Sequence, residues 1–304
     1  DRIVVLNTSG CWSIIGKIGG PQDLSLGDGC ETVGTAVHEI GHALGMFHTH
    51  SRHDRNDFII LIRQNFLLAY EDQFTKQTNW TNNNYGLTYD YGSVMHYGAR
   101  SVSKNGLPMM IPRHDIRYWL TLGSFTISFY DLLMMNVHYG CLDKCGGACS
   151  SNCHNGGFPH PRNCSKCVCP DGYGGDFCDE RPGDCGETLI ANSSFQTLDV
   201  SLGNRSDFKA KDEFSVCVYW IKAPEGSGIE VVLNNYWGGV TTDGCKYTGV
   251  EIKANADKRL TGYRFCSDKN SGVQLLSPNN VVPVLIYHRV YFHHVVLSYR
   301  IGNV

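Results

Sequence analysis

The sequence predicts a multidomain chain: an α+β domain comes first, a small disulfide-rich module follows, and an all-β sandwich ends the chain. Length and cysteine spacing support this order. The 304 residues are enough for two or three domains of about 100–200 residues each. Of the 14 cysteines, two lie in the first 140 residues, eight in 141–178 and four in 185–266. This spread indicates a core-stabilised domain, a module held by disulfides, and a unit with two widely spaced cysteine pairs.

Composition and charge exclude several classes of protein. Hydrophobic residues make up 42% and charged residues 18% of the chain, which is typical of globular proteins. The formal net charge of −3 offers no basic face for a nucleic acid. No apolar run reaches the roughly 18 residues of a membrane span. Disulfides on this scale require an oxidising compartment, so the chain is expected to be secreted.

The glycosylation motifs fit a secreted chain. Four sequons with an ordinary middle residue are candidate glycosylation sites, at Asn7, Asn79, Asn192 and Asn204. The chain shows no signal peptide and opens inside an apolar stretch, DRIVVLN. We therefore expect a fragment whose leader has been removed or lies outside the sequence.

Residues 31–44 predict an amphipathic helix that presents two metal ligands. His38 and His42 are four residues apart, so their imidazoles lie on one side of the helix, one turn from each other. Two neutral ring nitrogens placed in this way can bind one zinc ion. Glu39 projects about a quarter-turn away, where its carboxylate can reach a zinc-bound water as a general base. The apolar stripe of this helix is Val33, Ala36, Val37, Ile40 and Leu44.

The residues after this helix predict a third ligand. Gly45 tolerates the left-handed conformation that ends a helix, so the chain can turn and bring His48 back to the same ion. The string is H-E-x-x-H-x-x-G-x-x-H, the metzincin extension of the zincin motif. His50 lies two residues further on, and the spacing predicts a polar loop histidine that does not bind the metal.

The chain resembles the astacin metalloproteases in two stretches. These are GTAVHEIGHALGMFHTHSRHDRNDF at 34–58 and SVMHYG at 93–98. The resemblance implies one catalytic zinc ion held by His38, His42 and His48, with Met95 as a hydrophobic base beneath it. It also implies that Tyr97 is an additional zinc ligand that can swing away during turnover.

The resemblance extends over residues 1–141. Cys11, Trp12 and Ser13 resemble the edge strand to which an extended substrate adds, and Cys11–Cys30 would be the disulfide that anchors this rim. The stretch 127–141 resembles the last catalytic-domain helix, with a capping box of Ser128 and Asp131 and a core face of Leu132, Leu133, Met135 and Val137. The family's domain normally begins earlier, so we expect an N-terminally truncated peptidase domain that lacks the partner of Cys141. Thr49 stands where most relatives have a glutamate.

Residues 142–180 resemble an EGF-like module. The stretch CHNGG, the one-residue gap between Cys167 and Cys169, and the eight-residue last loop are typical of that module. The resemblance implies the pairs Cys153–Cys167 and Cys169–Cys178. The first loop closes onto Cys164 from either Cys145 or Cys149, and spacing does not decide between them.

Residues 185–301 contain alternating apolar strands and resemble a CUB domain, a β-sandwich used for protein contacts. The natural pairs are Cys185–Cys217 and Cys245–Cys266. Calcium-binding members have an aspartate where this chain has Thr248, and their late Ser-Asp element is replaced around 288–289. No calcium is therefore expected in this domain.

The order of these modules resembles the nematode-type astacins with EGF and CUB tails. It implies a secreted zinc endopeptidase that hydrolyses extracellular, matrix or cuticle proteins, with a possible protein partner bound through the CUB domain. The alternative is an extracellular scaffold protein that uses its EGF and CUB modules while the peptidase domain is inactive; the intact Glu39 argues against it. A third possibility is an active parent protein of which this shortened chain is inactive, because lost strands would expose a sheet edge.

Overall fold

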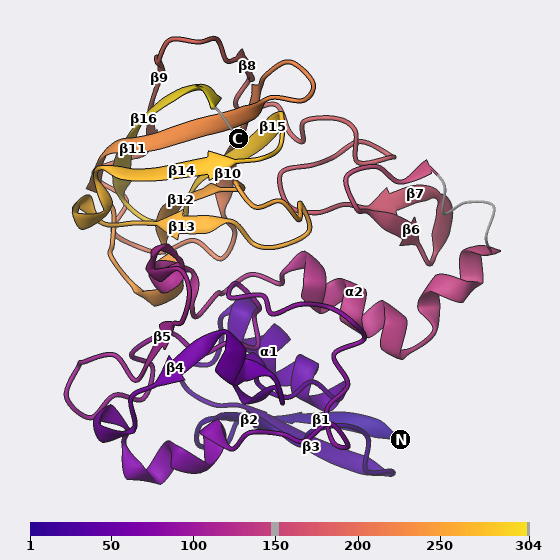
Figure 1. Ribbon diagram of the computed structural model, residues 1–304. Helices are drawn as coiled ribbons and strands as arrows, with labels where there is room; N and C mark the ends of the chain where they lie inside the picture. The colour runs from indigo at the N-terminus through magenta and orange to yellow at the C-terminus, as the bar shows by residue number, and fades with distance from the viewer. Residues whose placement is uncertain (147–151, 303–304) are drawn as a thin grey trace. The chain divides into compact units, whose positions relative to one another are not determined.

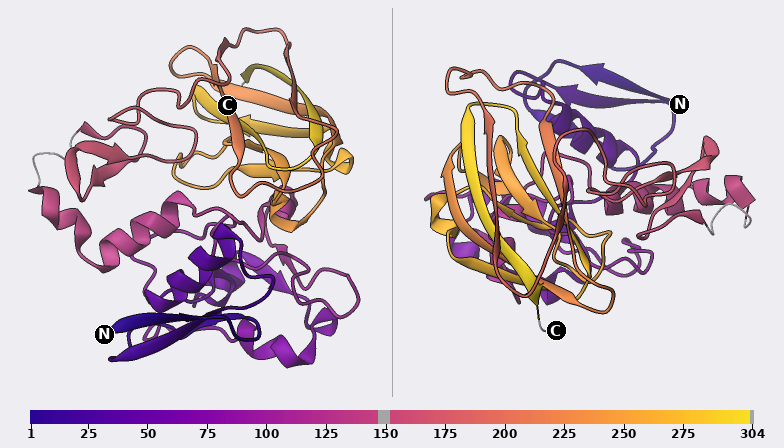
Figure 2. Two further views of the ribbon diagram at one scale, coloured as in Figure 1. Left: turned by 180° about the vertical axis from the view of Figure 1, so that it is seen from behind. Right: turned by 90° about the horizontal axis from the view of Figure 1, so that it is seen from above.

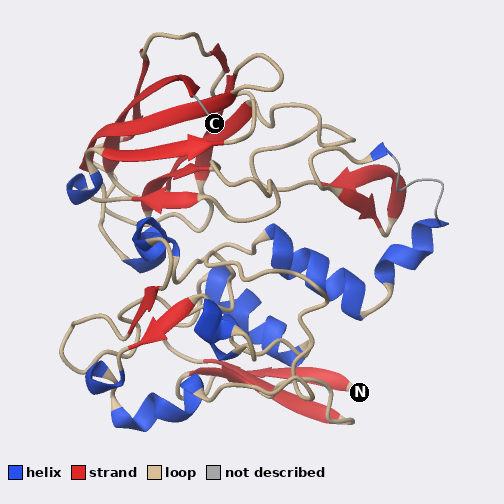
Figure 3. Ribbon diagram, in the orientation of Figure 1, coloured by secondary structure: helices blue, strands red, loops and turns tan. Residues whose placement is uncertain are grey.

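The computed structural model describes residues 1–146 and 152–302 (Figure 1). The chain divides into two compact units, Asp1–Met135 and Asn136–Val304, and each is described by itself. Helices and short helical turns are concentrated in the first unit, and strands dominate the second (Figure 3).

The first unit opens with a three-stranded sheet in the order β1-β3-β2. β1 (Arg2–Leu6) runs parallel to β3 (Pro21–Leu26), and β2 (Cys11–Ser13) pairs with β3 in the antiparallel sense. The second edge of β2 has no strand partner among the described residues. A disulfide joins Cys11 at the start of this edge strand to Cys30.

Helix α1 (Val33–Ala43) follows this sheet, with Thr32 as the N-cap: its side chain accepts from the backbone N–H of Thr35 at 3.2 Å. The predicted apolar stripe was wrong for three of its five residues, because Val33, Ile40 and Leu44 are 60%, 43% and 38% exposed. The buried residues of the helix are instead Gly34, Glu39, Gly41, His42 and Ala43. The helix thus packs through the face that carries its polar, metal-binding motif.

The rest of the first unit is built from short elements around an aromatic and methionine core. A two-stranded sheet pairs β4 (Ile59–Leu61) with β5 (Met110–Pro112). Single-turn or short 3-10 helices connect these parts: η1 (Thr49–Ser51), η2 (Arg55–Asp57), η3 (Arg63–Asn65), η4 (Leu68–Phe74) and η5 (Ile116–Thr121). The core cluster consists of Ile59, Phe66, Phe74, Tyr89, Ala99, Met109, Met110 and Leu122.

Helix α2 (Phe129–His138) lies within the stretch 127–141, and its capping box is present. The Asp131 N–H donates to Ser128 Oγ at 3.2 Å, and the Ser128 N–H donates to Asp131 Oδ2 at 2.9 Å. The expected core face was wrong at Leu132, which is 38% exposed, whereas Leu133 is buried. Phe129 and Tyr130 in the first turn are also buried.

The second unit begins with the disulfide-rich module. It contains the 3-10 helix η6 (Cys141–Cys145) and a hairpin of β6 (Phe158–His160) and β7 (Asn163–Val168). Its disulfides are Cys145–Cys164, Cys153–Cys167 and Cys169–Cys178. Cys145 is thus the half-cystine that closes the first loop. Cys149, the other candidate, lies outside the described residues, and Cys141 has no disulfide partner among those described.

The remainder of the second unit is a sandwich of two mainly antiparallel sheets (Figures 1 and 2). One sheet has five strands in the order β13-β12-β15-β10-β8, and the other has four in the order β14-β11-β16-β9. Their bounds are β8 (Thr188–Ile190), β9 (Gln196–Gly203), β10 (Ser215–Lys222), β11 (Gly228–Gly238), β12 (Thr248–Ile252), β13 (Tyr263–Phe265), β14 (Val273–Ser277), β15 (Val281–His288) and β16 (Phe292–Gly302). Cys185–Cys217 and Cys245–Cys266 are its disulfides.

The core of this sandwich follows from the two-residue period of its strands. In β16, Val295, Leu297 and Tyr299 are buried, while the residues between them are half-buried. Ile221 and Ile286 of the other sheet are fully buried as well. Side chains from both sheets therefore form one apolar layer between them, as sheet-on-sheet packing requires.

Candidate metal centre

Helix α1 and the turn after it place three imidazoles together. His38 and His42 lie one turn apart, and Gly45 follows the helix with φ of +99°. The backbone N–H of Gly45 donates to the carbonyl of His42 at 2.8 Å, which closes the turn. The chain then brings His48 back, so that one ring nitrogen from each histidine lies within 4.8 Å of the others.

The hydrogen bonds of these rings leave their Nε2 atoms free for a metal. Nδ1 of His38 lies 2.7 Å from the Val94 carbonyl, and Nδ1 of His42 lies 2.7 Å from the Met46 carbonyl. Because a carbonyl only accepts, both Nδ1 atoms carry the proton and both Nε2 atoms present a lone pair. The His48 ring bonds to the backbone of Gln73. These carbonyls fix the orientation of the ligands, as is usual around bound zinc.

The distances between the three Nε2 atoms fit a zinc ion. His48 Nε2 lies 3.1 Å from His38 Nε2 and 3.2 Å from His42 Nε2. Two nitrogens bound at about 2.05 Å to a tetrahedral ion are about 3.3 Å apart. Burial lowers the pKa of all three histidines, that of His38 to about 4, so the rings are neutral as metal binding requires. Lone pairs this close repel one another unless a cation lies between them.

Glu39 lies beside the three histidines and is not one of the group. Its side chain is only 5% exposed, and burial raises its pKa to about 7. Its Oε2 atom has no hydrogen-bond partner in the part of the chain that the structure describes. A buried carboxylate with a free oxygen, lining the same cleft as the ligands, can accept a proton from a bound water.

Tyr97 contributes the phenol of this cleft. Its ring centroid lies 4.5 Å from that of His48 and 6.3 Å from that of His38. Burial, followed by the nearby Glu39, raises its pKa to about 12, so the phenol keeps its proton without a metal. The structure thus brings all five candidate side chains, Glu39, Tyr97 and the three histidines, into one cleft.

Met95 lies against α1 in a buried cluster with Met46 and Val94. Its side chain has no exposed surface, and its Sδ would lie 2.7 Å from a Cβ added at Gly41. The backbone of the same turn serves the ligands directly, because the Val94 carbonyl binds His38 and the Met95 carbonyl accepts from Thr49 N at 3.0 Å. The turn that contains Val94 and Met95 therefore holds both α1 and Thr49, the residue after His48.

We expect Gly41→Ala to weaken zinc binding by about 10-fold, through displacement of Met95 and α1. The added methyl favours the helix by about 1 kcal/mol, but overpacking in a filled core costs about 1–3 kcal/mol. Competition with a chelator measures the zinc affinity. Ile40→Ala, at an exposed neighbouring position, is the control, and equal affinities for both variants would contradict the role given to Gly41.

Asp131 is a residue of this region for which the sequence predicts only a cap. Its side chain is 5% exposed and accepts from Ser93 Oγ at 2.6 Å and from the Val94 N–H at 2.9 Å. Ser93 Oγ also accepts from Thr49 Oγ1 at 2.8 Å. One carboxylate of α2 therefore holds the Met95 turn in place. The carboxylate of the capping motif was the only signal, and its long-range partners could not be read from the sequence.

The prediction that His50 is a polar loop residue was wrong. It lies in the 3-10 turn η1 and is 0% exposed. Its ring stacks on that of His48 at 4.8 Å and 17° and also lies 4.6 Å from the ring of Tyr97. The histidines whose ring nitrogens come together are His38, His42 and His48.

Two further stretches of the chain line the cleft. The edge strand β2 supplies Cys11, Trp12 and Ser13, and Ile15 follows it. Trp12 is 41% exposed. The second stretch is η4 with the loop after it, which supplies Asp72, Gln73, Thr75 and Gln77. None of these four residues is singled out by the sequence.

The first unit thus combines a three-histidine group that can hold a metal ion with an adjacent buried carboxylate, the arrangement expected of a zinc metallopeptidase domain. The family model Astacin, which describes a family of peptidases, matches residues 1–140. The chain is 47% identical over 300 residues to zinc metalloproteinase nas-31 of Caenorhabditis elegans, covering 99% of this chain and 49% of that protein. It is 37% identical over 305 residues to nas-25 of the same organism, covering 94% and 72%. The chain therefore belongs to the astacin family, which confirms the resemblance.

Among solved structures, the chain is similar to high choriolytic enzyme 1, a hatching enzyme zinc-protease from Oryzias latipes. The match has 34% identity and a TM-score of 0.44, and covers 46% of this chain and 69% of that one. The chain spans about half the length of nas-31 and nas-32, at 49% and 44%. No helix in the described part of the chain is both long and apolar enough to cross a membrane.

Proposed function

We propose that this chain is part of a secreted zinc endopeptidase. The observation that supports it most directly is the convergence of three histidine Nε2 atoms in a cleft that also contains the unpartnered Oε2 of Glu39. A zinc ion bound by His38, His42 and His48 would supply a Lewis acid that activates water and polarises the scissile carbonyl.

The chain's own residues perform the remaining steps. Glu39 accepts a proton from the attacking water and delivers it to the leaving amine. The Tyr97 phenol, which keeps its proton away from the metal, donates a hydrogen bond to the oxyanion that develops at the scissile carbonyl. The open edge of β2 binds the substrate as an additional strand through backbone hydrogen bonds.

The proposed substrates are extracellular proteins of matrix or cuticle. Six disulfides join described cysteines in both units, which fits an oxidising compartment. The asparagines of the four candidate sequons are exposed, so a glycan could be attached to each: Asn7, Asn79, Asn192 and Asn204. The similar nematode proteins are named zinc metalloproteinases.

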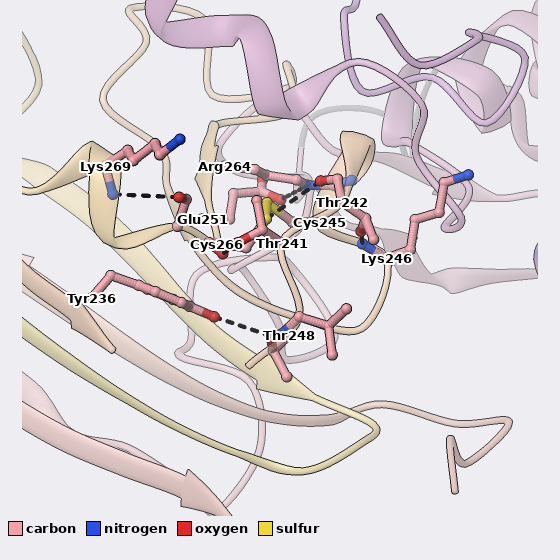
Figure 4. Close-up of a disulfide and its surroundings, with 12 residues drawn as sticks. Tyr236, Thr241, Thr242, Cys245, Lys246, Thr248, Glu251, Arg264, Cys266 and Lys269 are labelled. Carbon is pink, nitrogen blue, oxygen red and sulfur yellow. Dashed lines mark hydrogen bonds and ion pairs between the residues drawn. A yellow bond between two sulfur atoms is a disulfide. The ribbon is translucent and has the colours of Figure 1, made fainter. Parts of the chain in front are cut away.

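The second unit is proposed to contain an EGF-like module at 142–180 and a CUB domain at 185–301 that binds a protein partner without calcium. Near the Cys245–Cys266 disulfide, the Thr248 hydroxyl oxygen accepts from Tyr236 Oη at 3.0 Å and from the Val240 N–H at 3.2 Å (Figure 4). Both lone pairs of that oxygen are then used, and threonine carries no charge to attract a cation.

Zinc content and casein or gelatin hydrolysis test the proposal, on the full-length mature protein and on this chain. One zinc per protein and cleavage by the full-length form would support it. Zinc without cleavage in the full-length form would favour the scaffold function. If the full-length form cleaves and this chain does not, residues outside this chain are required for activity.

A further inference from the structure

Both polar backbone atoms of Tyr97 are bound by a buried imidazole. Its N–H donates to His50 Nδ1 at 3.3 Å, and its carbonyl accepts from His96 Nδ1 at 2.6 Å. His50 is 0% exposed and His96 is 2% exposed. Tyr97 itself lies in no helix or strand, so side chains hold the peptide groups on either side of it.

The hydrogen bonds fix the tautomer of each ring. Because the Tyr97 carbonyl only accepts, His96 carries its proton on Nδ1, and its Nε2 accepts from Tyr89 Oη at 2.6 Å. Because the Tyr97 N–H only donates, His50 is unprotonated at Nδ1 and carries its proton on Nε2. His50 therefore accepts a hydrogen bond from Tyr97, and His96 donates one to it.

The cost of burying His50 shows that packing alone does not account for an imidazole here. Its Nε2 has no hydrogen-bond partner in the described part of the chain. A buried donor without a partner costs about 1–3 kcal/mol, and an apolar ring of similar size would fill the same space without that cost. The feature that only an imidazole supplies is the Nδ1 acceptor for Tyr97.

Three neighbouring residues, Phe74, His48 and Arg55, contact His50. Its ring lies 4.8 Å from that of Phe74 and stacks on His48. Its carbonyl accepts from Arg55 Nη1 at 3.0 Å. Both the ring and the backbone of His50 are therefore held in place beside Tyr97.

We propose that His50 and His96 are a clamp that fixes the backbone of Tyr97, so that its phenol reaches and leaves the metal by side-chain rotation alone. This inference rests on the proposed role of Tyr97. His50 and His96 are positioning residues, because they act through Tyr97. A fixed backbone returns the phenol oxygen to the same place in every turnover, which affects the chemical step and leaves substrate binding unchanged.

The test compares His50→Leu with His50→Asn in the full-length mature protein. The two side chains are nearly equal in size, but only Asn offers an oxygen at the place of Nδ1. Each variant is loaded with copper(II), and the visible phenolate-to-copper charge-transfer band reports the position of Tyr97. Tyr97→Phe supplies the spectrum without that phenol. The zinc forms give kcat and KM, and zinc content checks that the three ligands are intact.

We expect His50→Leu to bind one metal, to lose or shift the band, and to lower kcat about 10-fold with KM nearly unchanged. His50→Asn should keep the band and most of kcat. The clamp would be overturned if His50→Leu had the wild-type band and kcat. It would also be overturned if His50→Leu and His50→Asn lost the band and kcat to the same extent. A wild-type spectrum identical to that of Tyr97→Phe would overturn the ligand role of Tyr97 and the clamp with it.

Tyr89→Phe tests the second half of the clamp with the packing preserved. Without the Tyr89 hydroxyl, His96 is free to carry its proton on Nε2, which would turn an Nδ1 lone pair towards the Tyr97 carbonyl. A kcat lowered about 3-fold in the same direction as His50→Leu supports the clamp. An unchanged kcat and band would remove His96 from it.

Discussion

Replacement of Glu39 by Gln is expected to leave zinc bound and to lower kcat/KM for casein about 1,000-fold in the full-length mature protein. Zinc stays because the ligand group consists of His38, His42 and His48 and does not include Glu39. Activity falls because the amide cannot accept a proton from water, and general-base catalysis contributes about 100- to 10,000-fold. Metal analysis and initial rates on the same preparation measure both effects.

Two variants control this experiment. Glu31→Gln makes the same change of charge at an exposed residue outside the cleft and should leave the rate unchanged. His48→Ala removes a ligand and should lose both zinc and activity, since two histidines remain. Cleavage by Glu39→Gln at the wild-type rate would exclude Glu39 as the general base. Loss of zinc from that variant would instead assign it a part in binding the metal.

Asp131→Ala is expected to destabilise the first unit by about 3–5 kcal/mol, since the buried carboxylate serves two parts of the structure at once. Its removal leaves the N–H groups of Ser128 and Val94 without their acceptors. Ser93 also loses its partner, so the turn that contains Met95 is no longer tied to α2. Zinc affinity should fall with stability, because the Val94 carbonyl orients His38.

The readout for Asp131→Ala is the temperature at which proteolytic activity is lost, which reports on the first unit in a multidomain protein. We expect it to fall by about 10 °C or more. Asp131→Asn keeps the shape and one acceptor oxygen, so its loss should be smaller. Asp28→Ala, at an exposed position, should have no effect. Equal thermal stability of Asp131→Ala and wild type would show that the carboxylate does not support the turn.

Local features of the fold could be predicted from the sequence because they depend on neighbours along the chain. The four-residue spacing of His38 and His42 places both on one side of a helix whatever surrounds it. Gly45 ends that helix with a positive φ, and Ser128 with Asp131 caps the next one. Each of these features involves residues within one or two helical turns, where backbone geometry leaves few alternatives.

The apolar stripe of α1 could not be predicted from neighbours along the chain. Periodicity identifies an apolar face, but it does not identify what the helix packs against. Val33 and Ile40 are exposed, and the buried face contains Gly41, where the absence of a side chain admits Met95. The contact of Met95 with the helix joins residues 54 positions apart (41 and 95), and no local pattern records it.

The three candidate zinc ligands, the adjacent carboxylate and the family of this protein could be predicted from the sequence alone, because the three histidines lie within eleven residues of one helix and turn. The positions of the supporting residues depend on the tertiary structure. His50 and Asp131 act on Tyr97 and the Met95 turn through hydrogen bonds that span 37 to 47 residues. Such bonds form because burial removes water from polar groups and leaves them only each other as partners, and which groups meet depends on the complete packing of the domain.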